Sequence, residues 1–210
     1  RAPTTVLSPA AAVCLTPPHA AGAVNVSLLA PGADPASARN LSFAFVAGPH
    51  AAALAPSVGE AGEPLLVRVE GRGFAQGHTT CLLGARAAPA TRLSSTELVC
   101  HVPALPAGEF ALRVAANGSA PEEGAGLTLL VLPPARVARA APSVGFERGG
   151  TLVAVYGGPF APSAALACSF GGRAVPAALV SPALVECVAP PGRAGTAQLR
   201  VSSNGVHFSR

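Results

Sequence analysis

The chain repeats itself at an interval of 86 to 87 residues, and this repeat limits the possible folds more than any other feature. Cys14, Cys100 and Cys187 follow one another at this interval, and Cys81 and Cys168 are 87 residues apart. The segments around these cysteines share one order of motifs: P-S-V-G, a strand pattern, G-x-x-F, a cysteine, a polar turn, and a Leu-Val pair close before a second cysteine. Self-similarity at a fixed period indicates copies of one structural unit. We therefore predict a tandem array of homologous modules.

The repeat also predicts where each module begins and ends. Residues 1–49 correspond to the C-terminal half of one module, 50–134 to a complete second, and 135–210 to a third. We refer to these ranges as module one, module two and module three. Module two carries the segment LTLLVL at 127–132, whereas module three has no counterpart of it, so we expect module three to be truncated in its last strand.

The residue patterns inside the repeat are those of short strands. Residues 65–70 and 151–156 are rich in strand-forming residues and are bounded by Gly or Pro. Residues 110–114 and 197–201 alternate with period two, which predicts one buried and one solvated face. Asn-Gly pairs follow at 117–118 and 204–205 and are typical of tight hairpin turns. No window of 11 residues free of Gly and Pro shows a helical apolar stripe, so we expect antiparallel β-sandwiches.

This order of motifs resembles the IPT/TIG immunoglobulin-like module. Module three carries nearly all of the pattern: Pro142, Gly145, Gly149, Gly150, Thr151, Gly157, Phe160, Cys168, Phe170, Gly171, Cys187, Pro190, Asn204, Gly205, Phe208 and Ser209. Module two departs from it at Glu63-Pro64 and at Leu83, and module one supports only its second half. The resemblance implies an all-β fold of tandem immunoglobulin-like (IPT/TIG) β-sandwiches. It implies no single function, because such modules occur in plexin-like receptors, in ciliary and surface proteins, and in transcription factors.

Four of the five cysteines form two equivalent pairs, and the fifth has no partner in the sequence. Cys81 and Cys100, like Cys168 and Cys187, are separated by 19 residues in matching positions. We expect both pairs to be disulfides, and we expect Cys14 to pair with a cysteine upstream of the segment. The alternative is small buried thiols in an intracellular sandwich.

Three N-glycosylation sequons agree with an oxidising, extracellular compartment. They begin at Asn25, Asn40 and Asn117. Asn117 lies in an expected hairpin tip, where a glycan is easily accommodated. Asn25 lies inside a strand pattern, so we expect a glycan there only if its side chain faces outward.

The composition argues against most other classes of function. The ten acidic residues include a single Asp, the five His are dispersed and no C-x-x-C occurs, so we expect no catalytic site, no metal site and no cofactor. The 14 basic residues are all Arg and are scattered without an aromatic ladder, which disfavours nucleic-acid binding. Pro or Gly interrupts every apolar stretch before the roughly 18 residues of a membrane span, so we expect no membrane insertion.

The sequence favours a structural or adhesive segment of a large extracellular glycoprotein. Such a segment would build a rod, filament, ciliary hair or cell-surface layer through contacts with other protein chains. The abundance of Ala, Gly, Pro and Arg, with no Lys or Ile, is typical of a GC-rich genome and suggests a green alga. A ligand-binding ectodomain of a receptor or cell–cell adhesin is the alternative, and an intracellular DNA-binding TIG domain is a third. The candidate contact residues are Arg72, Phe74, Tyr156 and Phe160.

Overall fold

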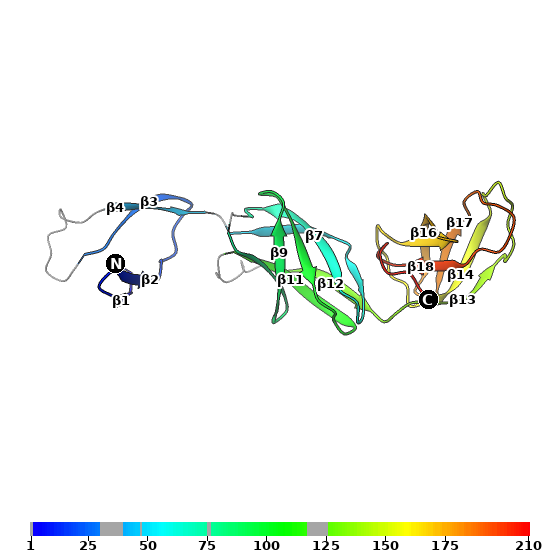
Figure 1. The fold of residues 1–210 in the computed structure, drawn as a ribbon, viewed down its shortest axis with the longest axis horizontal. Helices are drawn as coiled ribbons and strands as arrows, with labels where there is room; N and C mark the ends of the chain where they lie inside the picture. The colour runs from blue at the N-terminus through cyan, green and yellow to red at the C-terminus, as the bar shows by residue number, and fades with distance from the viewer. Residues whose placement is uncertain (1, 30–39, 47, 75–76, 117–125) are drawn as a thin grey trace. The chain divides into compact units, whose positions relative to one another are not determined.

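The computed structural model describes residues 2–29, 40–46, 48–74, 77–116 and 126–210 and shows β-strands without a helix in those ranges (Figure 1). The chain forms two compact units, residues 1–48 and 49–210. The all-β prediction is confirmed.

The described residues of module two, 50–74, 77–116 and 126–134, contain eight strands. They are β5 (His50–Ala55), β6 (Val58–Glu60), β7 (Leu65–Arg72), β8 (Thr79–Leu83), β9 (Arg86–Arg92), β10 (Glu97–Val102), β11 (Gly108–Ala116) and β12 (Leu127–Leu132). One layer holds β5, β7 and β10, and the other holds β8, β11, β12 and β6. The first half of β9 pairs with β8 and its second half with β10, so this strand crosses from one layer to the other.

Module three repeats this plan with six strands. They are β13 (Arg136–Ala141), β14 (Leu152–Gly158), β15 (Ala167–Phe170), β16 (Arg173–Ser181), β17 (Leu184–Val188) and β18 (Leu199–Ser202). β13, β14 and β17 form one layer, β15 and β18 form the other, and β16 crosses between them as β9 does. β18, the counterpart of β11, is the last strand in the pairing order.

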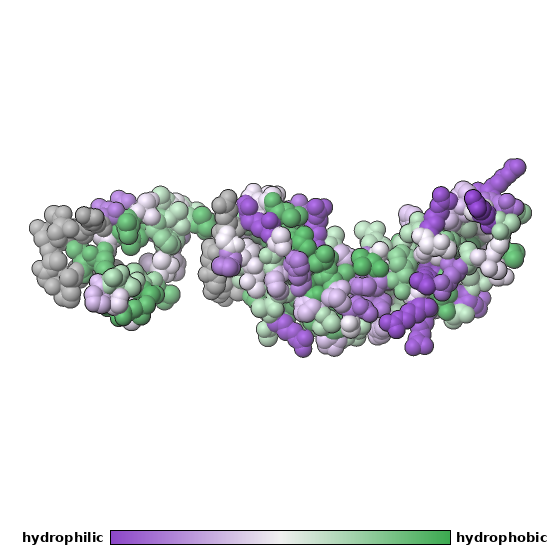
Figure 2. Space-filling model, in the orientation of Figure 1, coloured by the Kyte–Doolittle hydropathy of each residue, from purple (hydrophilic) through white to green (hydrophobic). Residues whose placement is uncertain are grey.

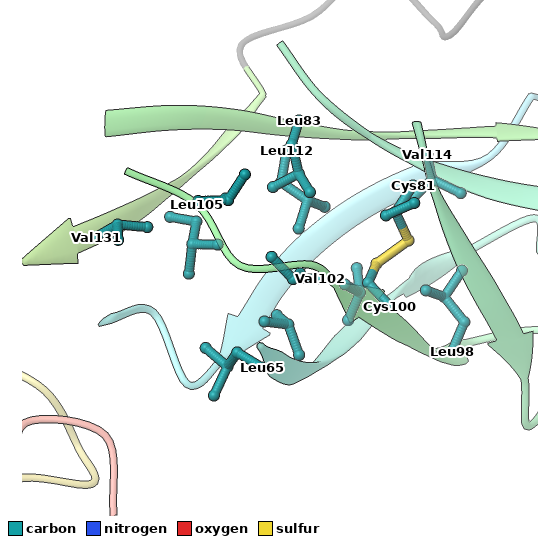
Figure 3. Packing of buried hydrophobic residues seen from close by; sticks show 14 of the residues in the cluster. Leu65, Cys81, Leu83, Leu98, Cys100, Val102, Leu105, Leu112, Val114 and Val131 are labelled. Carbon is teal, nitrogen blue, oxygen red and sulfur yellow. A yellow bond between two sulfur atoms is a disulfide. The ribbon is translucent and has the colours of Figure 1, made fainter. Parts of the chain in front are cut away.

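Each of these two modules has its own core, built from the alternating inward residues of both layers. In module two, Leu98, Leu112 and Leu129 are fully buried. Figure 3 shows the Cys81–Cys100 disulfide among these buried residues, near Leu98 and Val114. Because Val, Leu and Cys supply most of the core, the bond between the layers compensates for a shortage of large aromatic side chains.

The described residues of the first unit, 2–29, 40–46 and 48, form two strand pairs. β1 (Thr4–Ser8) pairs with β2 (Ala11–Cys14), and β3 (Gly22–Ser27) pairs with β4 (Asn40–Phe45), both antiparallel. Many of their large apolar residues are exposed, among them Leu7, Leu15 and Leu41. The assignment of residues 1–49 to half of a module stays a prediction.

The Asn204-Gly205 pair forms a turn of a different kind from the one expected. Asn204 is buried, and its side-chain oxygen accepts hydrogen bonds from the backbone N–H groups of Val206 and His207. Gly205 has the expected positive φ of 73°. The turn is therefore organised by the Asn side chain, and within residues 203–210 no strand follows it.

Candidate contact surface

The G-x-x-F motif buries its aromatic ring, so the prediction of an exposed contact surface is wrong for Phe74 and Phe160. Their exposed fractions are 1% and 3%. The backbone N–H of Phe74 donates to the Ser95 carbonyl (3.1 Å), and that of Phe160 donates to the Pro182 carbonyl (2.8 Å). These bonds fold the segment back toward the module, where burial of a Phe ring contributes about 1.5–3 kcal/mol.

The other two candidate residues remain accessible, one in each module. Arg72 is exposed at the end of β7. Tyr156 is half-buried on β14, with the guanidinium carbon of Arg139 lying 3.4 Å from its ring centroid. This cation–π contact holds the ring against β13.

Tyr156 belongs to a larger apolar face on the outside of module three. Along β14, Val153 and Val155 point into the core, while Leu152, Ala154 and Tyr156 point outward. Outward apolar residues on a solvated strand have no core to fill, so this face is available for contact with another molecule.

The neighbouring strands extend this face. Leu152 lies opposite Val188 on β17, and Glu186 lies between Ala154 and Ala178. Residues directly opposite in an antiparallel pair share one face of the sheet. We define the outer face by these residues: Arg139, Leu152, Ala154, Tyr156, Ala178, Val180, Glu186 and Val188. Leu152, Val180 and Val188 are 52–56% exposed, and Glu186 is the single carboxylate among them.

Module two repeats part of the pattern at equivalent positions. Leu66 corresponds to Leu152 and is 60% exposed, and Leu93 corresponds to Val180 and is 50% exposed.

The sequence itself indicates that the outer face of β14 is apolar. The run from Leu152 to Tyr156 is apolar at every position, whereas a strand with one solvated face usually alternates.

Two disulfides join the layers of modules two and three at equivalent positions, as predicted. Cys81 on β8 is bonded to Cys100 on β10 with a Cα–Cα distance of 5.9 Å. Cys168 on β15 is bonded to Cys187 on β17 with a Cα–Cα distance of 6.3 Å. Cys14, on β2, is exposed as a free thiol, and its pairing with an upstream cysteine stays a prediction.

An open groove of about 670 Å³ lies at one end of module three. Phe146, Phe170, Arg173 and the segment Pro190–Ala194 contribute to its lining. Phe146 is 83% exposed, and the Arg173 guanidinium donates to the Pro191 carbonyl at 2.6 Å. The groove therefore combines apolar side chains with charged ones of both signs, Arg173 and Arg193 together with Glu147.

In module two, a strand covers the positions equivalent to Val144 and Gly145. Gly145 lines the groove, and its counterpart Gly59 lies against Val131 of β12. Val144, next to the groove, is 80% exposed, whereas its counterpart Val58 is 3% exposed because β6 pairs with β12. At these two positions, module three is open where β12 covers module two.

Two of the three sequon asparagines lie among the described residues, and both are exposed. Asn25 is exposed in β3, and Asn40 is exposed as the first residue of β4. Asn117 lies outside the described residues. Among the described residues, no three side chains of His, Cys, Asp or Glu are grouped so as to hold a metal ion. The described ranges also contain no helix of the length and hydrophobicity needed to cross a bilayer.

Known proteins share both the sequence pattern and the fold of this chain. Mouse (Mus musculus) Fibrocystin-L is 26% identical over 197 residues, which is 93% of this chain and 4% of that protein. The plexin A4 extracellular region, domains 1 to 10, matches with a TM-score of 0.55 and 15% identity over 88% of this chain and 17% of that one. A second plexin A4 structure, of domains 1 to 8, matches with a TM-score of 0.52 and 14% identity over 78% of this chain and 17% of that one. The chain thus spans a small part of each relative.

The family model described as the IPT/TIG domain matches residues 49–128 and 136–209. These ranges contain the two disulfides, both G-x-x-F motifs and most of the two cores, while the core residues Leu129 and Val131 of module two lie just beyond the first range. The chain therefore belongs to the IPT/TIG domain family.

Proposed function

We propose that this chain is a non-enzymatic segment of an extracellular multi-module glycoprotein that builds a rod, filament, ciliary hair or surface layer. The outer face of module three carries this proposal, because it is an apolar surface outside the core and part of it recurs in module two. The contacts would form between copies of the chain.

The disulfides support the extracellular part of the proposal. Two bonds at equivalent places, each buried between two layers, fit an oxidising compartment, since cytosolic proteins rarely keep structural disulfides. The likeness to the plexin A4 extracellular region and to Fibrocystin-L agrees with a segment of a surface protein.

A single outer face would give a weak contact. Leu152, Val180 and Val188 are already about half covered. Full burial of such a side chain contributes about 1.5–3 kcal/mol, so covering the remaining half of each would add roughly 1 kcal/mol. Weak contacts repeated along an array gain strength through multivalency, which suits a structural protein.

Analytical ultracentrifugation of the oxidised chain over a concentration series tests the proposal. We expect wild-type association that Leu152→Glu weakens at least tenfold, since the substitution places a second carboxylate on the outer face. Gln198→Glu, at an exposed position immediately before β18 of the other layer, is the matched control and should associate like wild type. A chain that stays monomeric at every concentration, or a control that weakens association equally, refutes self-assembly through this face.

The distribution of charge favours a second candidate function, a ligand-binding ectodomain. Residues 135–210 contain seven Arg and two Glu, whereas residues 50–134 contain five Arg and seven Glu. In Figure 2, strongly hydrophilic side chains project from module three. A positively charged module would attract an acidic ligand. Salt-dependent binding of polyglutamate by a monomeric chain would support this function over self-assembly.

A further inference from the structure

The β3–β4 hairpin separates its polar and apolar residues onto two faces. In its register, Asn25 lies opposite Ser42, and Ser27 lies opposite Asn40. The intervening pair is Val26 opposite Leu41, and Val24 lies opposite Phe43. Because opposite residues share a face and successive residues alternate, one face carries both Asn and both Ser, and the other is apolar.

These four polar residues are the acceptor and hydroxyl positions of two complete sequons. Asn25-Val26-Ser27 lies on β3, and Asn40-Leu41-Ser42 begins β4. Each acceptor Asn therefore faces the hydroxyl residue of the other sequon across the strands. All four residues are exposed.

The repeat indicates that the polar face is the solvent face of module one. Asn25 lies 11 residues after Cys14, as Ala111 does after Cys100 and Gln198 does after Cys187. Both Ala111 and Gln198 are exposed. In module two, the neighbouring inward residues Leu112 and Leu129 are fully buried, and they correspond to Val26 and Phe43 of the apolar face.

We propose that Asn25 and Asn40 carry a pair of N-linked glycans on this one polar face. The proposal rests on the extracellular location proposed above. In the transfer, the Asn side-chain nitrogen bonds to the anomeric carbon of a lipid pyrophosphate-linked oligosaccharide, the bond to the pyrophosphate breaks, and the amide loses one proton. Diagonal neighbours in an antiparallel pair are about 7–8 Å apart, so the two glycans restrict access to each other and cover the face.

Glycopeptide mass spectrometry of the full chain secreted from a eukaryotic host tests this pair. We expect glycans on both Asn25 and Asn40 in one molecule. Asn25→Gln should remove one glycan and lower the oligomannose share on Asn40 at least twofold, because processing enzymes then reach the remaining glycan more easily. Asn40→Gln should have the reciprocal effect on Asn25.

Two serine variants are the matched controls. Ser42→Ala should abolish the glycan on Asn40 and keep the one on Asn25, although Ser42 lies opposite Asn25. Ser27→Ala should do the reverse. If Asn25 or Asn40 is bare while Asn117 is glycosylated and both disulfides are formed, the pair is refuted and the extracellular location stands. Two glycans that are processed independently of each other would refute the shared face.

Discussion

Replacing Gly157 by Ala would test why the G-x-x-F motif begins with glycine. A β-carbon at this position would overlap the carbonyl oxygen of Arg136 and lie 2.9 Å from its carbonyl carbon and 3.0 Å from the Cα of Val137. All three atoms are backbone of β13, which pairs with β14 at this point. Rotation of a flexible side chain therefore cannot relieve the overlap, and β13 must move away.

The cost of that movement follows from the contacts that β13 makes there. The pairings Arg136↔Gly158 and Val137↔Gly157 are adjacent to the overlap, and Val137 also packs partly against the core. Each lost hydrogen bond costs about 0.5–1.5 kcal/mol, and loss of partial Val burial adds roughly 1 kcal/mol. We therefore expect Gly157→Ala to lower the free energy of unfolding of module three by about 2–4 kcal/mol.

Tyr156 makes the measurement specific to module three, because the chain contains one Tyr and no Trp. Urea unfolding followed by tyrosine fluorescence gives the free energy of unfolding of this module. Gly192→Ala is the matched control, since a β-carbon there meets no atom within 4 Å and φ is not left-handed. The control should lie within about 1 kcal/mol of wild type. If Gly157→Ala unfolds with the same free energy as Gly192→Ala, the close approach of β13 does not explain the glycine.

The remaining predictions concern stability in both modules. Replacing Cys168 and Cys187 together by Ala should lower the unfolding free energy by roughly 3 kcal/mol, as the chain-entropy model gives for a loop of this size, and tyrosine fluorescence measures it. Leu129→Ala, at a fully buried position, should cost module two about 2–5 kcal/mol in thermal unfolding followed by circular dichroism, and an effect below about 1 kcal/mol would contradict the core assignment. Ser209→Ala removes the hydroxyl that accepts the Val201 N–H at 3.1 Å, so Val201 should exchange its amide hydrogen faster; the unchanged exchange of Val155 is the control.

The cysteine spacing predicted the parts of the fold that depend on repetition. A pair separated by 19 residues at the same place in two modules implies the same geometry twice, and both bonds are present. Strand patterns such as residues 65–70 placed β7 correctly, because alternation of buried and exposed residues is encoded locally.

The direction of single side chains after a turn was less predictable. Phe74 follows Gly73 at the end of a strand, where a surface position is a reasonable expectation. Its direction depends on the bond from its N–H to Ser95, which lies 21 residues later in sequence. Such a long-range contact leaves no local pattern, so sequence reasoning placed the ring on the wrong side.

The two proposed surfaces require different outward side chains on the two layers of a module. The outer face lies on the layer of β14 and β17, and its apolar side chains must stay uncovered to make contacts. The proposed glycan pair lies on the β3–β4 hairpin, which corresponds to β11 and β12 in the opposite layer of module two. Because the disulfide and the inward residues hold the two layers together, the outward residues of each can differ without loss of the core. One layer can therefore make protein contacts while the opposite layer carries glycans.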